Sequence, residues 1–164
     1  MAQYAGLSLF DIYARKCEEL HCKRNSALAA QLPKKPDYFE APTSLDLSNN
    51  FVGPKGLLAV LEVVRCCTGL ISLDVQDQQM TNDSVQAICD VLQHHPSVTT
   101  LNVSNNPITI EAGRAILDLV RANPRLERVH LQNTGMRSVM TGAISVQLSK
   151  NREAKKPAAR AEGT

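Results

Sequence analysis

The sequence contains no tryptophan, and aromatic residues make up only 4% of its 164 residues. Aromatic side chains normally supply much of the area buried in a core, so aliphatic side chains must fill this interior. An aliphatic interior suits layers of repeated units better than a β-sandwich or a ligand-binding barrel. No stretch approaches the roughly 20 apolar residues that cross a bilayer, and residues 1–20 lack the charged start and apolar run of a signal peptide. We therefore expect no membrane span.

Disulfide and metal signatures are also missing. The five cysteines are an odd number without a Cys-x-x-Cys pair, which argues against a secreted disulfide framework and against a zinc site. Cys89 lies near His94 and His95 in the sequence, but zinc needs three or four converging ligands. We expect Cys89 to point into the core, and we predict no metal, no cofactor and a cytoplasmic location.

The net charge of +2 is unevenly distributed along the chain. Residues 150–164 contain five basic and two acidic residues, a net +3, which leaves −1 for the rest. A nearly neutral body has no electrostatic footprint for nucleic acid, so we do not expect a nucleic-acid partner. The basic tail suits an acidic protein surface or weak binding of RNA, or is simply a solubilising end.

A 28-residue repeat dominates the sequence. Four apolar positions recur at this spacing, and a second set follows two residues after the first, as on one face of a β-strand. Further along each repeat, two more apolar positions lie four residues apart, as on one face of an α-helix. The strand columns are Leu45, Leu73, Leu101, Val129 and Leu47, Val75, Val103, Leu131; the helix columns are Val60, Ile88, Ile116, Ile144 and Val64, Leu92, Val120, Leu148.

Each unit is therefore a short strand, a turn and a helix. No unit can bury its apolar side alone, but stacked units share a continuous core. We predict an α/β solenoid of four 28-residue units, with parallel strands on the concave side and helices outside. Because a helix is wider than the spacing between strands, the stack curves into an arc.

The repeat resembles the ribonuclease-inhibitor type of leucine-rich repeat. Residues 105–108 (Asn-Asn-Pro-Ile), 111–113 (Glu-Ala-Gly) and 115–116 (Ala-Ile) match the consensus of that type, and residues 101–126 resemble the carboxy-terminal repeat domain of tropomodulins. This resemblance implies a scaffold for protein interactions, in a family that includes inhibitors, GTPase activators, cytoskeletal caps and flagellar proteins. Gln78 and Thr134 stand where the repeat has asparagine, so we expect weaker hydrogen bonding between units at the second and fourth turns.

Three segments follow from the pattern. Residues 1–41 form a helical cap, residues 42–149 form the arc of four repeats, and residues 150–164 form a basic tail. In the cap, we expect one buried helical stripe of Phe10, Tyr13, Cys17 and Leu20, and a second helix capped by Asn25 or Ser26. We expect the unbound tail to be disordered, so that its deletion leaves the fold intact.

The candidate partner-binding residues lie on two surfaces. On the concave face, side chains between the core positions form polar rows with an acidic end and a basic end, and an ordinary solvated strand surface is an equal alternative. Asp46 and Asp74 are neighbours there, but an open face without a pocket does not favour catalysis. The candidates are Asp46, Ser48, Asp74, Gln76, Asn102, Ser104, Arg128, His130 and Gln132 on the concave face, and Lys150, Arg152, Lys155, Lys156 and Arg160 in the tail.

These features predict a non-enzymatic interaction module, an adaptor or structural subunit of a larger intracellular assembly of cytoskeletal or flagellar type. The partner would be a protein docked on the concave face, or on the uncovered edge of the strand at residues 129–131 together with the tail. The alternative function is regulation of an enzyme, as an inhibitor or GTPase activator, through the concave face.

Overall fold

The computed structural model describes residues 2–36, 41–48 and 50–156. A 3-10 turn and two helices precede four strand–helix units. In chain order, the elements are η1 (Ala2–Tyr4), α1 (Leu9–Glu19), α2 (Ser26–Gln31), β1 (Ser44–Asp46), α3 (Gly53–Cys66), β2 (Ser72–Asp74), α4 (Asn82–Leu92), β3 (Thr100–Asn102), α5 (Ile110–Ala122), β4 (Arg128–His130) and α6 (Ser138–Lys155).

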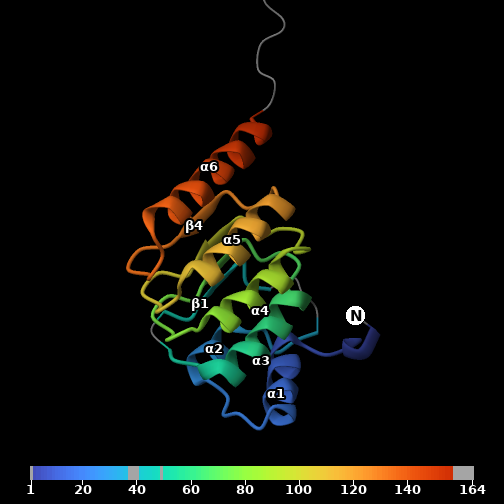
Figure 1. Ribbon diagram of the computed structural model, residues 1–164. Coiled ribbons are helices and arrows are strands. Elements are labelled where there is room, and N and C mark those ends of the chain that lie inside the picture. Colours follow the sequence, from blue (N-terminus) through green and yellow to red (C-terminus); the bar gives the residue numbers. More distant parts are fainter. Residues whose placement is uncertain (1, 37–40, 49, 157–164) are drawn as a thin grey trace, which may run out of the picture.

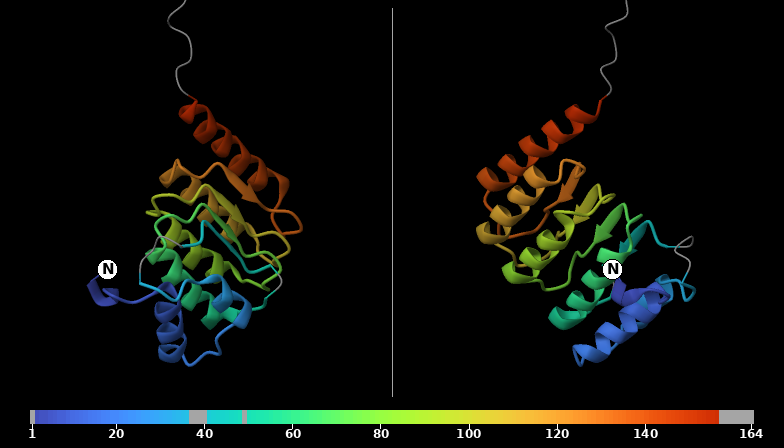
Figure 2. Two further views of the ribbon diagram at one scale, coloured as in Figure 1. Left: turned by 180° about the vertical axis from the view of Figure 1, so that it is seen from behind. Right: turned by 90° about the vertical axis from the view of Figure 1, so that its right-hand side faces the viewer.

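The four strands form one parallel sheet in the order β1-β2-β3-β4. Each strand pairs with the next at a shift of 28 residues, so that Leu45, Leu73, Leu101 and Val129 lie side by side. Helices α3 to α6 lie together on one side of this sheet, and the views of Figures 1 and 2 show the resulting two layers. The predicted fold, a short solenoid of four parallel strands with outer helices, is confirmed.

The core lies between the two layers and consists of the expected columns. Leu45, Leu73 and Leu101 are fully buried, and so are Ile88 and Leu92 on the facing helix. Val129 and Leu131, in the fourth unit, are half-buried because no strand of the described residues follows β4 in the sheet. Burial is therefore complete in the middle of the stack and incomplete at its carboxy-terminal end.

The helical cap packs α1 against α3. Ser8 begins α1 with a capping box, in which its hydroxyl accepts from Asp11 N while the Asp11 carboxylate accepts from Ser8 N, a common helix start. Asn25 caps α2, as expected.

The buried stripe of α1 differs in part from the prediction. Tyr13 and Cys17 are buried as expected, but Leu9 and Ile12 complete the stripe, and Phe10 and Leu20 lie at its half-buried margin.

Helix α6 is longer than the sequence suggested. It continues through Lys155, so residues 150–155, which we assigned to a disordered tail, are helical. Asn151 is buried and its amide donates to Val120 O and to Leu126 O, both at 2.9 Å. The expectation that deleting residues 150–164 leaves the fold intact conflicts with these contacts. Arg160 lies outside the described residues.

Candidate functional site

The asparagine position of the repeat forms a ladder of hydrogen bonds between neighbouring turns. Asn106 is buried; its amide donates to Val75 O at 3.0 Å in the preceding repeat, and its carbonyl oxygen accepts from Gln78 N and Met80 N, both at 3.0 Å. Gln78 reaches the first repeat in the same way, donating to Leu47 O and accepting from Val52 N at 3.2 Å.

Thr134 behaves differently. Its hydroxyl donates to Leu131 O within its own turn, and no bond to the preceding repeat is present among the described residues. The ladder is thus weaker at both positions, as expected: Gln78 spans the gap but accepts one N–H bond from the preceding repeat where Asn106 accepts two, and the Thr134 hydroxyl bonds within its own turn.

A second polar column, which we did not predict from the sequence, runs along the ends of the helices. Its members are again 28 residues apart, and all are buried: Cys67, His95, Asn123 and Asn151. Asn123 donates to Leu92 O at 2.8 Å and to His95 O at 3.2 Å, which are carbonyls at the end of the preceding helix. Such carbonyls have no partner within their own helix, so His95, Asn123 and Asn151 cap the ends of α3, α4 and α5 from the next repeat. The Cys67 thiol instead donates to Pro42 O, outside any helix. The 28-residue spacing was visible in the sequence, but the differing residue types concealed it.

His95 has a defined tautomer in this column. Its Nε2 lies 3.2 Å from Val64 O and 3.1 Å from Cys67 O, whereas Nδ1 faces the N–H groups of Ser97 and Val98 at 3.3 and 3.2 Å. Two carbonyls require a proton on Nε2, and two N–H donors require a lone pair on Nδ1. Burial lowers the pKa of His95, so the neutral ring is the form that fits.

Several polar side chains of the concave face form hydrogen bonds with other groups of the same face. Asp74 accepts from Gln76 N at 3.0 Å through one oxygen and from the Asn102 amide at 2.9 Å through the other. Asp46 and Asn102 each accept from the N–H two residues ahead, those of Ser48 and Ser104. These side chains therefore hold the strand ends and join neighbouring repeats.

One residue of this face differs from an open, accessible row. Ser104 is only 4% exposed, and its hydroxyl donates to Gln132 Oε1 at 2.7 Å, so its assignment to an accessible row is wrong. Asp46 and Asp74 are neighbours across β1 and β2, as expected. By contrast, Arg128 and His130 are exposed and form no ion pair among the residues described.

The two edges of the sheet differ in the hydrogen-bond partners of their backbone groups. At the amino-terminal edge, the Gln31 side chain donates to Asp46 O at 3.1 Å and accepts from Asp46 N at 3.4 Å, so α2 occupies the place of a neighbouring strand. At the other edge, β4 pairs with β3 alone. In each earlier unit, the equivalent N–H bonds to the next strand: Leu47 N to Asp74 O, Val75 N to Asn102 O and Val103 N to His130 O, at 2.9 to 3.1 Å. The next in this series, Leu131 N, has no such bond in the described part of the chain.

A groove of about 190 Å³ runs beside this open edge, between β4 and α6. Val129, Leu131, Ile144 and Leu148 give it an apolar floor, and basic side chains stand at its rim: Arg128, His130 and Arg152. Three predicted partner-binding residues, Arg128 and His130 on β4 and Arg152 on α6, thus line the same groove. Lys155 turns elsewhere, towards Glu127 and Arg125 O, while Lys150 and Lys156 are exposed.

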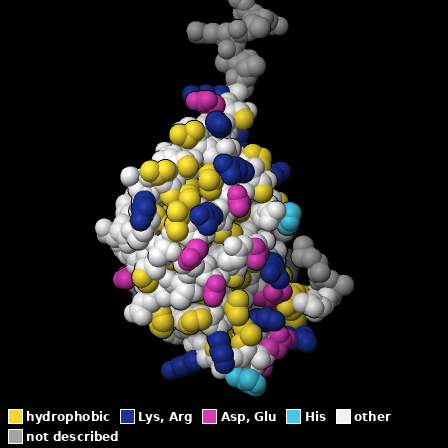
Figure 3. All heavy atoms as spheres, in the orientation of Figure 1, with side chains coloured by type: hydrophobic (Ala, Val, Ile, Leu, Met, Phe, Trp, Pro, Cys, Tyr) yellow, Lys and Arg dark blue, Asp and Glu magenta, His cyan; other side chains and the backbone are white. Residues whose placement is uncertain are grey.

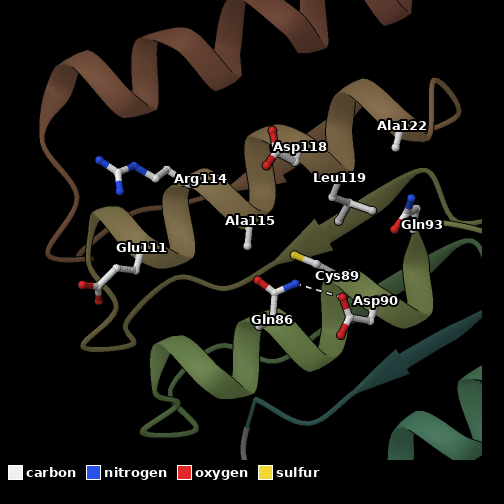
Figure 4. A pocket seen from close by; sticks show the side chains of 10 residues that line it. All are labelled: Gln86, Cys89, Asp90, Gln93, Glu111, Arg114, Ala115, Asp118, Leu119 and Ala122. Atoms are coloured by element: carbon white, nitrogen blue, oxygen red, sulfur yellow. Dashed lines mark hydrogen bonds between the residues drawn. The ribbon is translucent and has the colours of Figure 1, made fainter.

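A groove on the outer helical layer has a different character. It holds about 310 Å³ between α4 and α5, with Cys89 at its base and Glu111, Arg114 and Asp118 at its rim (Figure 4). Cys89 is 4% exposed, and burial raises the pKa of its thiol to about 12, which makes it a poor nucleophile. This agrees with the core position expected for Cys89.

The described residues hold neither a cluster of metal ligands nor a membrane span. Within residues 2–36, 41–48 and 50–156, no group of three or more His, Cys, Asp or Glu side chains is arranged to hold a metal ion. In those residues, no helix is long and apolar enough to span a membrane. All five cysteines are free thiols.

Repeated strand–helix units on a single parallel sheet, joined by a buried amide ladder, define a leucine-rich-repeat protein. Comparison with known proteins agrees: residues 43–61 and 94–117 match the family described as Leucine Rich repeat. This chain is thus a short leucine-rich-repeat solenoid. No curated protein sequence matches it.

Solved structures also match this chain, among them the following two. One is described as leiomodin-1 actin-binding site 2, with a TM-score of 0.56 and 17% identity, covering 68% of this chain and 82% of that one. The other is a tropomodulin C-terminal domain from Caenorhabditis elegans, with a TM-score of 0.45 and 11% identity, covering 68% and 83%. At these identities, the leiomodin likeness supports the fold.

Proposed function

We propose that this protein is a non-enzymatic adaptor or structural subunit of a protein assembly, and that its carboxy-terminal end is the main docking surface. The difference between the two sheet edges carries this proposal. Gln31 satisfies the backbone of β1, whereas in the described part of the chain β4 has a free N–H at Leu131 beside an apolar groove. Protein sheets normally protect such edges, so an open one is a natural place for a partner.

The chemistry of this end indicates which kind of partner would bind. An extended segment can add to β4 as a fifth strand, because an edge offers main-chain hydrogen bonds to any strand of suitable register. Its apolar side chains would enter the groove between Val129 and Ile144, and its acidic side chains would meet Arg128 and His130. The concave rows are a weaker candidate, because four of their side chains already pair with one another, Asp74 with Asn102 and Ser104 with Gln132.

The setting that we favour is cytoskeletal. The leiomodin structure is described as an actin-binding site, which makes actin the first partner to test. The basic residues 150–164, including Lys156 and Arg160, would add charge-dependent attraction at the same end of the molecule.

The test compares partners captured from native cells by three forms of the full chain. These are the original protein, an edge variant carrying both Arg128→Glu and His130→Glu, and a control, Arg114→Glu, on the outer helical layer. We expect the edge variant alone to lose specific partners, with circular dichroism showing that all three are folded. Identical partner sets for all three forms would refute docking at β4. Co-sedimentation with filamentous actin tests the actin assignment separately.

The tail is tested through its charges rather than by truncation. Removal from Lys150 would also remove the contacts of Asn151, Arg152 and Lys155, and residues 157–164 contain one arginine and one glutamate, so that their side chains carry no net charge. Lys150 and Lys156 are exposed, and we expect the double variant Lys150→Gln with Lys156→Gln to weaken partner binding more at low salt than at high salt, because exposed charges are screened by ions. Equal affinity of both forms at every salt concentration would exclude a role for these two charges.

A further inference from the structure

A third groove lies at the amino-terminal end of the solenoid, opposite the β4 edge. It holds about 720 Å³ and separates the α1–α2 connection from the start of α3. One wall consists of residues 22–26 and the other of residues 51–56. In Figure 1, these two segments approach one another at the lower end of the molecule, far from α6. Neither segment contributes to the concave face or to the carboxy-terminal groove.

An exposed aromatic ring stands in the second wall. Phe51 is 60% exposed and is the one exposed aromatic side chain among the described residues. Its ring lies against Gly53: a Cβ placed on that glycine would sit 3.7 Å from Phe51 Cε1. Gly53 also has a φ of +70°, a conformation that glycine adopts without strain. The Phe51 ring therefore packs against the backbone at Gly53 on one side, and most of the side chain is exposed to solvent.

Aromatic rings are enriched at protein interfaces, because a large rigid side chain loses little conformational freedom when it is covered. Rings are also costly to leave in water. An open Phe51 in a protein with so few aromatic residues therefore indicates a surface that is covered in use. The same ring gives the groove an apolar anchor point.

The charged residues of the groove all have one sign. Lys23, Arg24 and Lys55 line it, and no Asp or Glu does so among the residues described. None of the three forms an ion pair within residues 2–36, 41–48 and 50–156. Figure 3 shows Lys and Arg side chains next to apolar ones at this lower end of the molecule. Unpaired basic side chains around a ring complement a partner with the opposite charge.

We propose that this groove binds an acidic protein segment that lays one apolar side chain against Phe51, with flanking carboxylates paired to Lys23, Arg24 and Lys55. A single ring without a second stacking partner fits one apolar side chain better than the successive bases of a nucleic acid. The groove is a second docking surface, at the opposite end from β4. With both surfaces occupied, the chain can bridge two proteins.

The experiment uses the full chain labelled with ¹⁵N and three synthetic probes. The first is an acidic peptide with a central leucine flanked by glutamates, the second has alanine in place of the leucine, and the third is a single-stranded RNA oligonucleotide of similar length. We expect the leucine peptide to shift the backbone signals of residues 22–26 and 51–56. The alanine peptide should bind about tenfold more weakly, because one anchoring side chain is worth on the order of a factor of ten.

Matched variants show which side chains contribute to the affinity for the peptides. Phe51→Ala should weaken the leucine peptide by about tenfold and remove its advantage over the alanine peptide. Lys55→Glu should weaken both peptides, and more so at low salt. Leu58→Ala, an exposed apolar position on α3 outside the groove, should change neither. Thermal melts establish that each variant is folded, and a second charge variant, Arg24→Glu, replaces Lys55→Glu if that protein is unstable.

Several results would overturn the proposal: no peptide binding, binding that Phe51→Ala leaves unchanged, or tighter binding of the RNA at the same signals. Signal shifts confined to residues 128–131 would place the peptide at β4 instead and leave this groove without a ligand. The β4 variant Arg128→Glu with His130→Glu should retain binding at Phe51. Failure of this proposal is therefore distinguishable from failure of the proposed function.

Discussion

Protonation of His95 should destabilise the fold. The neutral ring donates through Nε2 to Val64 O and Cys67 O and accepts at Nδ1 from Ser97 N and Val98 N. A second proton on Nδ1 would point at two N–H donors inside the core and would also bury a charge, which is costly without a partner. No carboxylate is within hydrogen-bonding distance of this ring among the residues described, so nothing compensates the charge.

The direction of the pH dependence follows from the lowered pKa. The folded protein holds His95 neutral to a lower pH than the unfolded chain does, where histidine titrates near pH 6.5. Below that pH the unfolded state binds more protons, so stability falls with falling pH. The stabilisation that neutral His95 provides is fully present above about pH 7. It is lost as the pH falls through the pKa of the unfolded state towards the lower pKa of the folded state. If His95 stays neutral in the folded state, the loss between pH 7.5 and 5.5 is about 1.4 kcal/mol at most.

The measurement is the free energy of unfolding by urea at several pH values between about 7.5 and 5.5, a range that spans the titration of an unfolded histidine, for three proteins. His95→Asn copies the next member of the column, because Asn123 donates to two carbonyls and accepts from Arg125 N two residues ahead. We expect it to be folded and to lose the pH-dependent part of the stability. His94→Asn, at the exposed neighbour, should follow the original protein. Parallel curves for the original protein and His95→Asn would refute the assigned tautomer and its role.

Three further perturbations test the repeat architecture. Leu101→Ala, at a fully buried position in the middle of the sheet, should cost about 2–5 kcal/mol of unfolding free energy in denaturant melts; a cost below about 1 kcal/mol would contradict its core position. Asn106→Ala should cost more than Thr134→Ala in the same assay, because it breaks bonds between turns and leaves buried groups unpaired; equal costs would mean that the ladder contributes little. A bulky alkylating reagent should label the half-buried Cys22 before the buried Cys89 in native protein, and the reverse order by mass spectrometry would contradict the packing.

The sequence alone determined the fold, because each repeat presents the same apolar columns at the same spacing. A 28-residue period with two-residue and four-residue subperiods leaves one way to bury all the columns, which is to stack the units. The positions of Leu101 and Ile88 in the core therefore follow from the repeat pattern by itself. The amide ladder could be located for the same reason, although the outcome at Gln78 depended on side-chain reach.

Tertiary structure alone decided what the polar residues do. Asp74 and Ser104 look like surface residues in the sequence, but neighbouring repeats bring partners to them from 28 residues away. The boundary of the tail was wrong for a similar reason: residues 150–155 include three basic side chains and look solvated in the sequence, yet Asn151 among them donates to Val120 O and Leu126 O. The edge at Leu131 and the ring of Phe51 are exposed because no element of the described chain covers them. Local patterns report which side chains avoid water, whereas hydrogen-bond partners and uncovered ends depend on where distant segments meet.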